Sequence, residues 1–256
     1  MTTLSVGGGS HNIQVYGNGT VYAGSGNDSI DVHGTGMIVA GSGNESITEN
    51  TNGNISVGGG SDTVTLLGTG SISENGSGGH DTINLGFGSD TIYEHGQATV
   101  YGEFGTASIV GGSLAILNSG SDYHELIAST GNATLIGGEY TNQFVAGSGN
   151  VDMVGSGKLG PDTFVGGSGH DTMTGGANTN LFEFLQSEKG GHTVITNFVS
   201  GQDQLYLEGH SFSWLEQNHD ISSSGGNTTI TLDGGQTTIE LKGVSSLHSS
   251  DITTHK

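Results

Sequence analysis

The chain has 256 residues, including 50 glycines, one proline and no cysteine, and its formal net charge is −21. This glycine content is far above the usual share of about 7% and has no G-X-Y period, which excludes collagen and is unlike an ordinary globular enzyme. The charge excludes nucleic acid and anionic membranes as partners, because the chain repels both. No apolar run reaches the roughly 20 residues that cross a bilayer, so no transmembrane segment is expected.

The first ten residues, MTTLSVGGGS, contain neither the basic region nor the apolar region of a cleavable signal peptide. Export of this protein would therefore need a route that does not depend on an N-terminal signal. The absence of cysteine removes disulfide and thiol chemistry from consideration.

Long apolar residues then recur every eight or nine positions. A helix would place them three or four apart, so this step predicts short strands separated by turns rich in glycine, serine and asparagine. The members of the series are Ile13, Val21, Ile30, Ile38, Ile47, Ile55, Val64 and Ile72, then Ile83, Ile92, Val100 and Ile109, and later Leu135, Phe144, Met153, Phe164, Met173 and Phe182.

Two strands and two turns make one coil of 17 or 18 residues, and stacked coils place Ile30 over Ile13 and Ile47 over Ile30. We therefore expect an all-β protein: a parallel β-roll or β-helix solenoid of about ten coils with a C-terminal β-rich cap. The solenoid is expected over residues 1–184, with an irregular part at 94–156.

A carboxylate stands two places before the inward residue in most coils of the first part. The residues at this place are His11, Asp28, Glu45, Asp62 and Asp81, whereas the opposite edge has Gly19, Gly36, Gly53 and Gly70. Residues 1–157 carry fourteen carboxylates and no lysine or arginine, so stacked carboxylates need another source of positive charge. Calcium, which accepts six or more oxygen ligands, fits such turns better than magnesium does. The glycine edge is expected to bind no ion.

Several segments resemble the nonapeptide G-G-x-G-x-D-x-U-x of RTX proteins, in which U is a large apolar residue. GGSGHDTMT at 166–174 matches at every place, and weaker copies stand at 157–165 and 175–183. A second tandem pair is GSGGHDTIN at 76–84 and LGFGSDTIY at 85–93. The resemblance is fair over 6–75 and poor over 94–156.

The resemblance implies a β-roll in which calcium ions lie between turns of adjacent coils, bound by carbonyl oxygens and the repeat aspartate. By motif place it nominates Asp28, Glu45, Asp62, Asp81, Asp90, Asp162, Asp171 and Asn180 as metal ligands. Three residues depart from the motif: Glu45 adds a methylene, Asn180 lacks the charge, and His11 is a poor calcium ligand. The surest site is expected between Asp162 and the turn that contains Asn180.

Residues 185–256 resemble the segment that follows the repeats in RTX proteins, which caps the roll and carries an uncleaved signal for type I secretion. Independently of the resemblance, residues 228–232 and 237–241 alternate polar and apolar side chains around a DGGQ turn, which predicts a hairpin. Phe212, Trp214 and Leu215 are expected to cover the last coil. The protein is therefore predicted to be secreted without an N-terminal signal peptide.

These features favour a secreted, calcium-binding structural or adhesive protein that folds when it binds calcium. The first coil has no cap of its own, so self-association through its edge is expected, unless the chain is a fragment. No enzymatic activity is expected, because the chain has no nucleophile elbow, no H-E-x-x-H and no phosphate loop.

Two other classes of function remain open. The first is a calcium-dependent lyase or epimerase acting on acidic polysaccharide, for which the candidate acid–base group is His95 and His124 with Glu94, Asp122 and Glu125. The second is a carbohydrate- or ice-binding module. Tyrosines expected to face outward could stack on cell-surface polysaccharide, but they do not repeat at one coil spacing; they are Tyr16, Tyr22, Tyr93, Tyr101, Tyr123 and Tyr140.

Overall fold

The computed structural model describes residues 2–76, 79–94, 97–111, 114–118, 124–128, 130–156 and 158–254. The chain divides into two compact units, Met1–His124 and Glu125–Lys256, here called unit 1 and unit 2. The protein is all-β with little helix, and its mostly parallel strands form a β-solenoid of about nine turns, against about ten expected. The predicted fold class is confirmed; that the C-terminal segment caps the solenoid stays a prediction.

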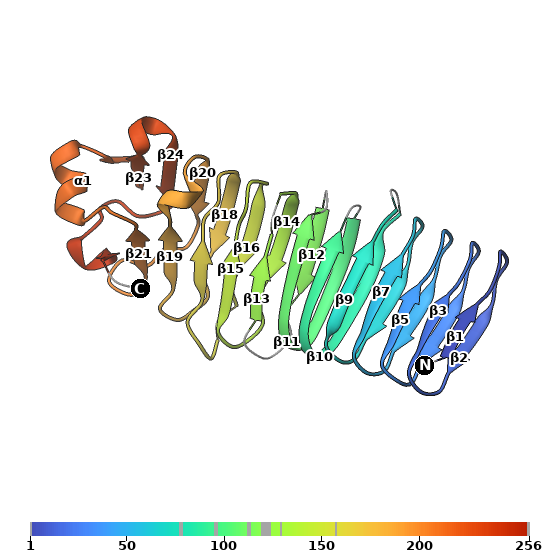
Figure 1. Ribbon diagram of the computed structural model, residues 1–256. Coiled ribbons are helices and arrows are strands. Elements are labelled where there is room, and N and C mark those ends of the chain that lie inside the picture. Colours follow the sequence, from blue (N-terminus) through green and yellow to red (C-terminus); the bar gives the residue numbers. More distant parts are fainter. Residues whose placement is uncertain are drawn as a thin grey trace. The chain divides into compact units, whose positions relative to one another are not determined.

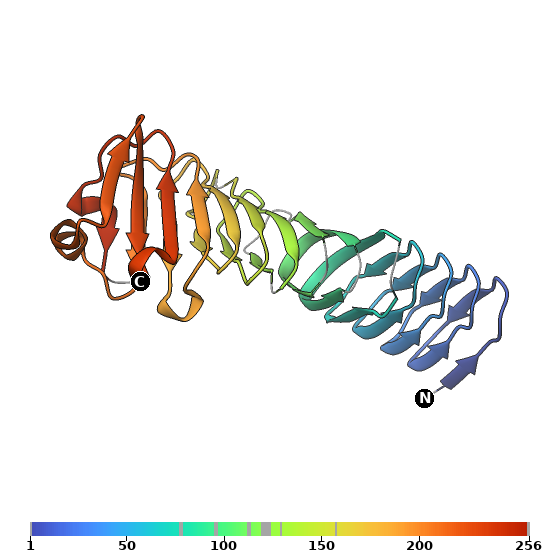
Figure 2. The same ribbon diagram turned by 90° about the horizontal axis from the view of Figure 1, so that it is seen from above.

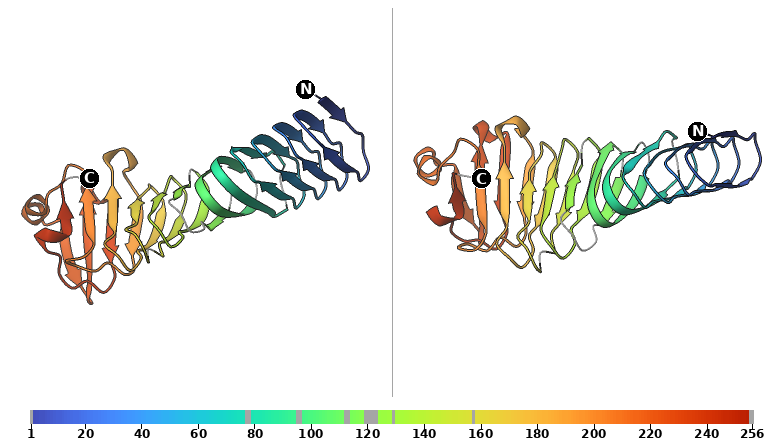
Figure 3. Two further views of the ribbon diagram at one scale, coloured as in Figure 1. Left: turned by 90° about the horizontal axis from the view of Figure 1, so that it is seen from below. Right: turned by 60° about the horizontal axis from the view of Figure 1, so that its bottom comes forward.

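Unit 1 is a stack of coils, most of which have two short strands, whereas Asp81–Glu94 and Gln97–Gly111 are each one continuous strand that occupies both strand places of a coil (Figure 1). Two further views show that turns join the strands at both edges of the two-strand coils (Figure 3). Its strands are β1 (Thr2–Ser5), β2 (Asn12–Val15), β3 (Gly19–Tyr22), β4 (Ser29–Val32), β5 (Gly36–Val39), β6 (Ser46–Glu49), β7 (Gly53–Val57), β8 (Thr63–Leu66), β9 (Gly70–Glu74), β10 (Asp81–Glu94), β11 (Gln97–Gly111) and β12 (Leu114–Asn118).

The register of these strands follows the apolar series of the sequence. Ile13 pairs with Ile30, Ile30 with Ile47 and Ile47 with Val64, all between parallel strands. A second ladder on the opposite side of the coils consists of Val21, Ile38, Ile55, Ile72 and Ile92. These side chains are buried, so the core of unit 1 is a narrow column of aliphatic residues between the two sides of the coils.

Unit 2 begins with coils of the same kind and then changes to antiparallel pairing. Its elements are β13 (His124–Ile127), β14 (Asn132–Ile136), β15 (Asn142–Val145), β16 (Val151–Val154), β17 (Thr163–Val165), β18 (His170–Thr174), β19 (Leu181–Phe184), β20 (His192–Ile195), β21 (Gln204–Leu207), α1 (Phe212–Asn218), β22 (Ile221–Ser224), β23 (Asn227–Leu232), β24 (Thr237–Leu241) and β25 (Ile252–Thr253). Short 3-10 helices cover Gln186–Glu188, Asp233–Gly235 and Ser249–Asp251.

Aromatic rings form one of the two core ladders of unit 2, and Leu135, Met153, Met173 and Ile195 form the other. Phe144 stacks on Phe164 with ring centroids 4.7 Å apart, and Phe164 stacks on Phe182 at 5.0 Å. β23 and β24 pair antiparallel, which confirms the predicted hairpin, and β22 adds to β23 (Figure 2). β24 also pairs in parallel with β20. In α1, Leu215 is buried and Trp214 is exposed.

Residues 94–156, expected to be irregular, include strands β11 to β16, and β14 pairs with β16 in the same parallel manner as the other coils. The division at residue 184 that the sequence suggested stays a prediction. Among the described residues, no helix is long and apolar enough to cross a membrane.

Candidate metal site

All eight nominated side chains point into the solenoid. A side chain two places before an inward residue lies on the same face of the strand, which places the nominated carboxylates beside the apolar ladder. Each of the eight is at most 4% exposed: Asp28, Glu45, Asp62, Asp81, Asp90, Asp162, Asp171 and Asn180. Buried carboxylates need hydrogen bonds, protons or cations, so their partners decide what these turns can bind.

One oxygen of most of these carboxylates is hydrogen-bonded to the preceding coil. In unit 1, Asp28 Oδ1 accepts a hydrogen bond from the backbone N–H of His11, and Asp62 Oδ1 accepts one from that of Glu45, both at 2.8 Å. Asp81 Oδ1 accepts one from the N–H of Asp62 at the same distance. This ladder fixes the carboxylates at one edge of consecutive coils.

Other carboxylate oxygens at this edge have no hydrogen-bond partner. Asp28 Oδ2, Asp62 Oδ2 and both carboxylate oxygens of Glu45 are buried and unpartnered. The extra methylene of Glu45 therefore takes it out of the ladder that Asp28 and Asp62 share. A buried oxygen without a donor is costly, so these turns are incomplete without a proton or a cation.

The pKa values reflect this shortage of partners. Burial, together with the adjacent carboxylates of Asp62, Asp28 and Asp81, raises the pKa of Glu45 to about 8. Burial also raises the pKa of Asp81 to about 6, with Asp62 and Glu74 adding repulsion. In the described part of unit 1, the ion pairs of acidic side chains involve only histidines, namely His11 with Asp28 and His33 with Asp31.

The glycine turns bring backbone carbonyls to the same edge. Gly43 and Gly60 have φ angles of +152° and +148°, which residues other than glycine rarely adopt. A Cβ atom on Gly43 would lie 2.2 Å from the carbonyl oxygen of Gly26 and 2.7 Å from Glu45 Oε1. The carbonyl of one coil and the carboxylate of the next therefore meet at this glycine. Carboxylate and carbonyl oxygens together are the donors that calcium prefers.

Asp90 occupies the edge that has glycine in the preceding coils. It pairs in register with Gly70, and its Oδ1 accepts a hydrogen bond from the Gly70 N–H at 2.8 Å. Burial raises its pKa to about 6. A carboxylate therefore first occurs at this edge after four glycines: Gly19, Gly36, Gly53 and Gly70.

Sequence reasoning missed buried carboxylates at the other end of the strands. Glu49 is fully buried at the end of β6, in the inward place that Val32 and Leu66 hold in the neighbouring coils. Its Oε1 accepts hydrogen bonds from the N–H and the hydroxyl of Thr51, and its Oε2 has no partner. Burial raises its pKa. The sequence signal that could have identified Glu49 is a charged residue at a place where neighbouring coils have an apolar one. The same signal identifies Glu74, which stands at the place of Val57 in the preceding coil.

In unit 2 the carboxylates are better provided with donors. Asp171 accepts hydrogen bonds from the N–H groups of Val151 and Gly167, one on each oxygen. Asp162 Oδ1 accepts one from the N–H of Asn142, but its Oδ2 is buried and unpartnered. Burial raises the pKa of both aspartates. Asp203, which was not nominated although it also stands two places before an inward residue, is buried as well.

No group of three or more histidine, aspartate or glutamate side chains that could hold a metal occurs among the described residues. Each turn offers one or two carboxylates, and the remaining ligands must be backbone oxygens. Of the candidate acid–base group, Glu94, His95, Asp122 and His124 lie outside the residues whose side chains are described, and Glu125 is half-buried in β13. Five of the six tyrosines are exposed as expected, and Tyr123 lies outside the described residues.

The fold and these turns define a parallel β-solenoid with buried carboxylates along its edges. A family model for the RTX calcium-binding nonapeptide repeat matches four copies, at residues 15–34, 75–93 and 154–182. The match and the solenoid together fit an RTX β-roll protein, and calcium is the ion of these repeats. No curated protein is similar enough to the chain to count as a relative. The matched segments contain six of the eight nominated residues; Glu45 and Asp62 lie outside them.

Proposed function

We propose that this chain is a secreted structural or adhesive protein whose β-roll folds when it meets extracellular calcium. RTX repeats are typically structural and RTX proteins are typically secreted. The observation that carries the proposal is the column of buried carboxylates of Asp28, Glu45 and Asp62, whose unpartnered oxygens lie in a part of the chain that has no lysine or arginine.

We assign calcium to the carboxylates of Asp28, Glu45, Asp62, Asp81, Asp90, Asp162 and Asp171. The ion supplies the positive charge that the acidic edge lacks. Because the ligands come together only in the folded coils, binding free energy becomes folding free energy. A site with calcium at 100 times its dissociation constant stabilises the fold by roughly 2.7 kcal/mol. Asn180 was nominated by the same motif place, but its amide nitrogen donates hydrogen bonds to the carbonyls of Gly176 and Asn178.

The test is far-UV circular dichroism of the purified chain during calcium addition. We expect the β signal of unit 1 to appear with calcium and to disappear with excess chelator. Binding should be counted in parallel by native mass spectrometry. A spectrum that chelator leaves unchanged, with no ions bound, would refute the proposal.

We also propose that unit 1 self-associates through β1 and β2. All four residues of β1 are exposed, and it pairs with β3 on one side only within the described chain. A free strand edge presents unpaired N–H and C=O groups to another chain. Light scattering at millimolar calcium should show oligomers that Thr3→Pro reduces. A monodisperse monomer would contradict this part of the proposal.

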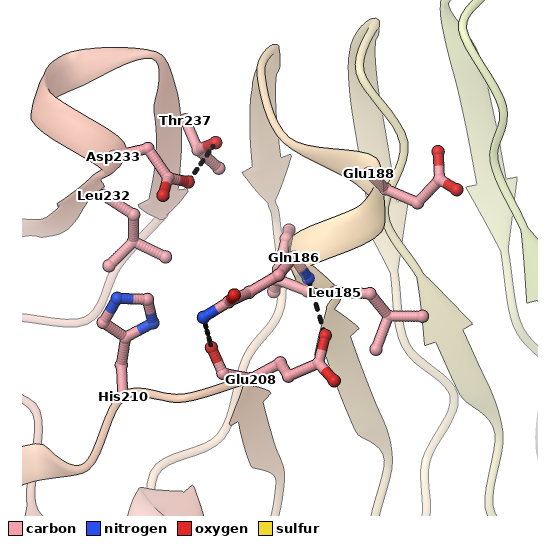
Figure 4. A pocket seen from close by; sticks show the side chains of 9 residues that line it. Leu185, Gln186, Glu188, Glu208, His210, Leu232, Asp233 and Thr237 are labelled. Atoms are coloured by element: carbon pink, nitrogen blue, oxygen red, sulfur yellow. Dashed lines mark hydrogen bonds between the residues drawn. The ribbon is translucent and has the colours of Figure 1, made fainter.

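A second candidate function is carbohydrate binding in unit 2. A hollow of about 270 Å³ is lined by Tyr206, His210 and Trp214, among others, and aromatic rings are suitable platforms for sugars. The neighbouring hollow between Gln186, Glu208 and Asp233 is only about 10 Å³, enough for one water molecule (Figure 4). Glycan-array binding that Trp214→Ala abolishes would favour this function. Turnover of an acidic polysaccharide would instead favour an enzyme.

We further propose that residues 185–256 carry the secretion signal and cap the last coil. The support is the change to antiparallel pairing at β22–β24 and the resemblance of this segment to RTX flanking segments. Co-expression with a type I exporter tests the signal. The full chain should appear in the medium, and a chain ending at residue 184 should stay in the cell; equal export of both would contradict the assignment.

A further inference from the structure

One edge of unit 2 carries a column in which asparagine and aspartate alternate. Asn142, Asp162, Asn180 and Asp203 follow one another on successive coils, and all four are buried. Asp162 Oδ1 accepts a hydrogen bond from the N–H of Asn142 at 2.8 Å, Asn180 Oδ1 accepts one from the N–H of Asp162 at 3.2 Å, and Asp203 Oδ1 accepts one from the N–H of Asn180 at 2.8 Å. The ladder is therefore the same as in unit 1.

The asparagine amides make contacts that a carboxylate cannot make. Asn180 Nδ2 donates hydrogen bonds to the carbonyls of Gly176 and Asn178 in its own turn, at 3.1 and 2.8 Å, and to Asp203 Oδ1 at 3.1 Å. Asn142 Nδ2 likewise donates hydrogen bonds to the carbonyls of Gly138 and Tyr140, at 3.2 and 2.8 Å, and to Asp162 Oδ1 at 3.0 Å. Each amide thus joins two turn carbonyls to the carboxylate of the next coil.

The orientation of the Asn180 amide follows from its neighbours. The backbone N–H of Asp162 faces one end of the amide and requires an acceptor, whereas two carbonyl oxygens face the other end and require a donor. Only the arrangement with Nδ2 toward the carbonyls satisfies both.

Asp162 has an unpartnered oxygen where the asparagines have nitrogen. The glycine that begins each turn serves as a common reference point. A Cβ atom on Gly137 would lie 2.7 Å from Asn142 Nδ2, and a Cβ atom on Gly175 would lie 2.7 Å from Asn180 Nδ2. A Cβ atom on Gly155 would lie 2.3 Å from Asp162 Oδ2. The three atoms therefore occupy equivalent places. Two of them are donors in use, and the third is a buried acceptor without a partner.

We propose that the side-chain amides of Asn142 and Asn180 take the place of calcium in their turns, so that these two turns close without an ion. The inference rests on the proposed calcium binding of the aspartate turns. It implies that a turn with aspartate at this place binds calcium and that a turn with asparagine there does not. It also removes Asn180 from the expected ligands and leaves Asp162 as a calcium turn between two ion-free ones.

The physical reason is the exchange of a donor for an acceptor at constant shape. A carboxylate at position 180 would place an oxygen about 3 Å from the carbonyl oxygens of Gly176 and Asn178, with no donor between them. Such a cluster of oxygens repels itself unless a cation binds. The present NH₂ group avoids that need.

The experiment compares Asn180→Asp with wild type in the full chain. In chelator, the melting temperature of unit 2 should fall by roughly 4–8 °C, the shift expected for leaving one buried group without a partner. In calcium, the stability should recover and native mass spectrometry should count one additional ion. Asn150→Asp is the matched control, because Asn150 is exposed and only its Oδ1 accepts a hydrogen bond, from the His170 N–H. It adds the same charge and should leave both readouts unchanged.

Asp162→Asn is the reciprocal variant and keeps the test informative if Asn180→Asp does not fold. It should bind one ion fewer than wild type and should melt at a higher temperature in chelator. The inference is overturned if Asn180→Asp is as stable as wild type in chelator and gains no ion, or if Asp162→Asn loses neither an ion nor calcium dependence. If wild type binds no calcium at all, the proposed function fails, while the stabilities of both variants in chelator still decide the role of the amides.

Discussion

The two oxygens of a repeat carboxylate have different surroundings, and this difference explains why single residues matter so much here. In Asp28 and Asp62, Oδ1 is hydrogen-bonded to the backbone of the preceding coil, while Oδ2 is buried without a donor. The first oxygen fixes the side chain in the ladder, and the second creates the need for a cation. Glu45 provides two unpartnered oxygens and no ladder bond.

Shortening Glu45 should therefore improve the calcium edge. Glu45→Asp places the carboxylate as in Asp28 and Asp62, where one oxygen can join the ladder, and we expect about 1 kcal/mol of added stability in calcium. The measurement is chemical unfolding at saturating calcium. Glu45→Gln, which removes the charge but keeps the length, is the control and should bind fewer ions. A loss of stability in Glu45→Asp would mean that the longer side chain is required.

Stability without calcium should fall as the pH rises. Glu45 has a pKa of about 8 in the folded chain against an ordinary value of 4.5, and Asp81 and Asp90 have values of about 6 against 3.8. Between these values the folded state binds more protons than the unfolded state, so the free energy of unfolding decreases with pH from about 4 to about 8. Protons then substitute for the missing cations at the low end of this range.

The measurement is the fraction of unit 1 that is folded in calcium-depleted buffer at pH 5.5 and at pH 8, followed by far-UV circular dichroism. We expect the higher value at pH 5.5. Calcium affinity should change in the opposite direction, because the ligands must lose their protons to bind the ion. A folded fraction without calcium that rises with pH would show that these carboxylates do not limit stability.

At the scale of the coil, the turns tolerate no side chain where backbones of adjacent coils meet. Gly60 has a φ of +148°, and a Cβ atom there would lie 1.5 Å from the carbonyl oxygen of Gly43. Gly7, in the first turn, has no atom within 4 Å of its Cβ place. The two glycines look alike in the sequence, but only one of them is required by the stack.

Gly60→Ala should destabilise unit 1 by at least about 1–3 kcal/mol, from backbone strain alone, and the clash with the Gly43 carbonyl adds to this cost. Gly7→Ala is the matched control and should be nearly neutral. Thermal unfolding at saturating calcium measures both. Equal melting temperatures for the two variants would show that the coils can separate enough to admit a methyl group.

Periodicity was sufficient to predict the strands and the core ladder. The steps of eight and nine residues identified Ile13, Ile30 and Ile47, which pair in register and are buried. The motif likewise identified the inward aspartates. Glu49 was missed because its burial depends on Gly36 and Gly53, whose missing side chains leave room for it, and not on the pattern of its own segment. The role of Asn142 depends on Asp162, one coil later, and no pattern within either segment reveals it.

At the scale of the whole molecule, the few positively charged residues all lie in the C-terminal part of the chain. The four basic residues are Lys158, Lys189, Lys242 and Lys256, and the formal net charge is −21. Charge of this size keeps a chain soluble but destabilises its compact form through repulsion. Two kinds of repulsion must be separated: that between exposed acids, which salt screens, and that among buried acids, which salt does not reach.

Monovalent salt should therefore not replace calcium. At 0.15 M ionic strength the Debye length is about 8 Å, so repulsion between exposed carboxylates is already weak in ordinary buffer. The carboxylates of Asp28, Glu45 and Asp62 are buried, and their unpartnered oxygens need a ligand rather than an ionic atmosphere. We expect millimolar calcium to fold unit 1 where sodium chloride at the same or higher ionic strength does not.

Circular dichroism at matched ionic strength, with chelator in the sodium arm, makes this comparison directly. Magnesium at the same concentration is the sharper control, because it has the same charge but dehydrates reluctantly and suits carbonyl-rich sites poorly. Folding by calcium alone would assign the effect to coordination in the turns. Folding by all three salts would assign it to screening of the surface, and the buried oxygens would then have to be satisfied by protons.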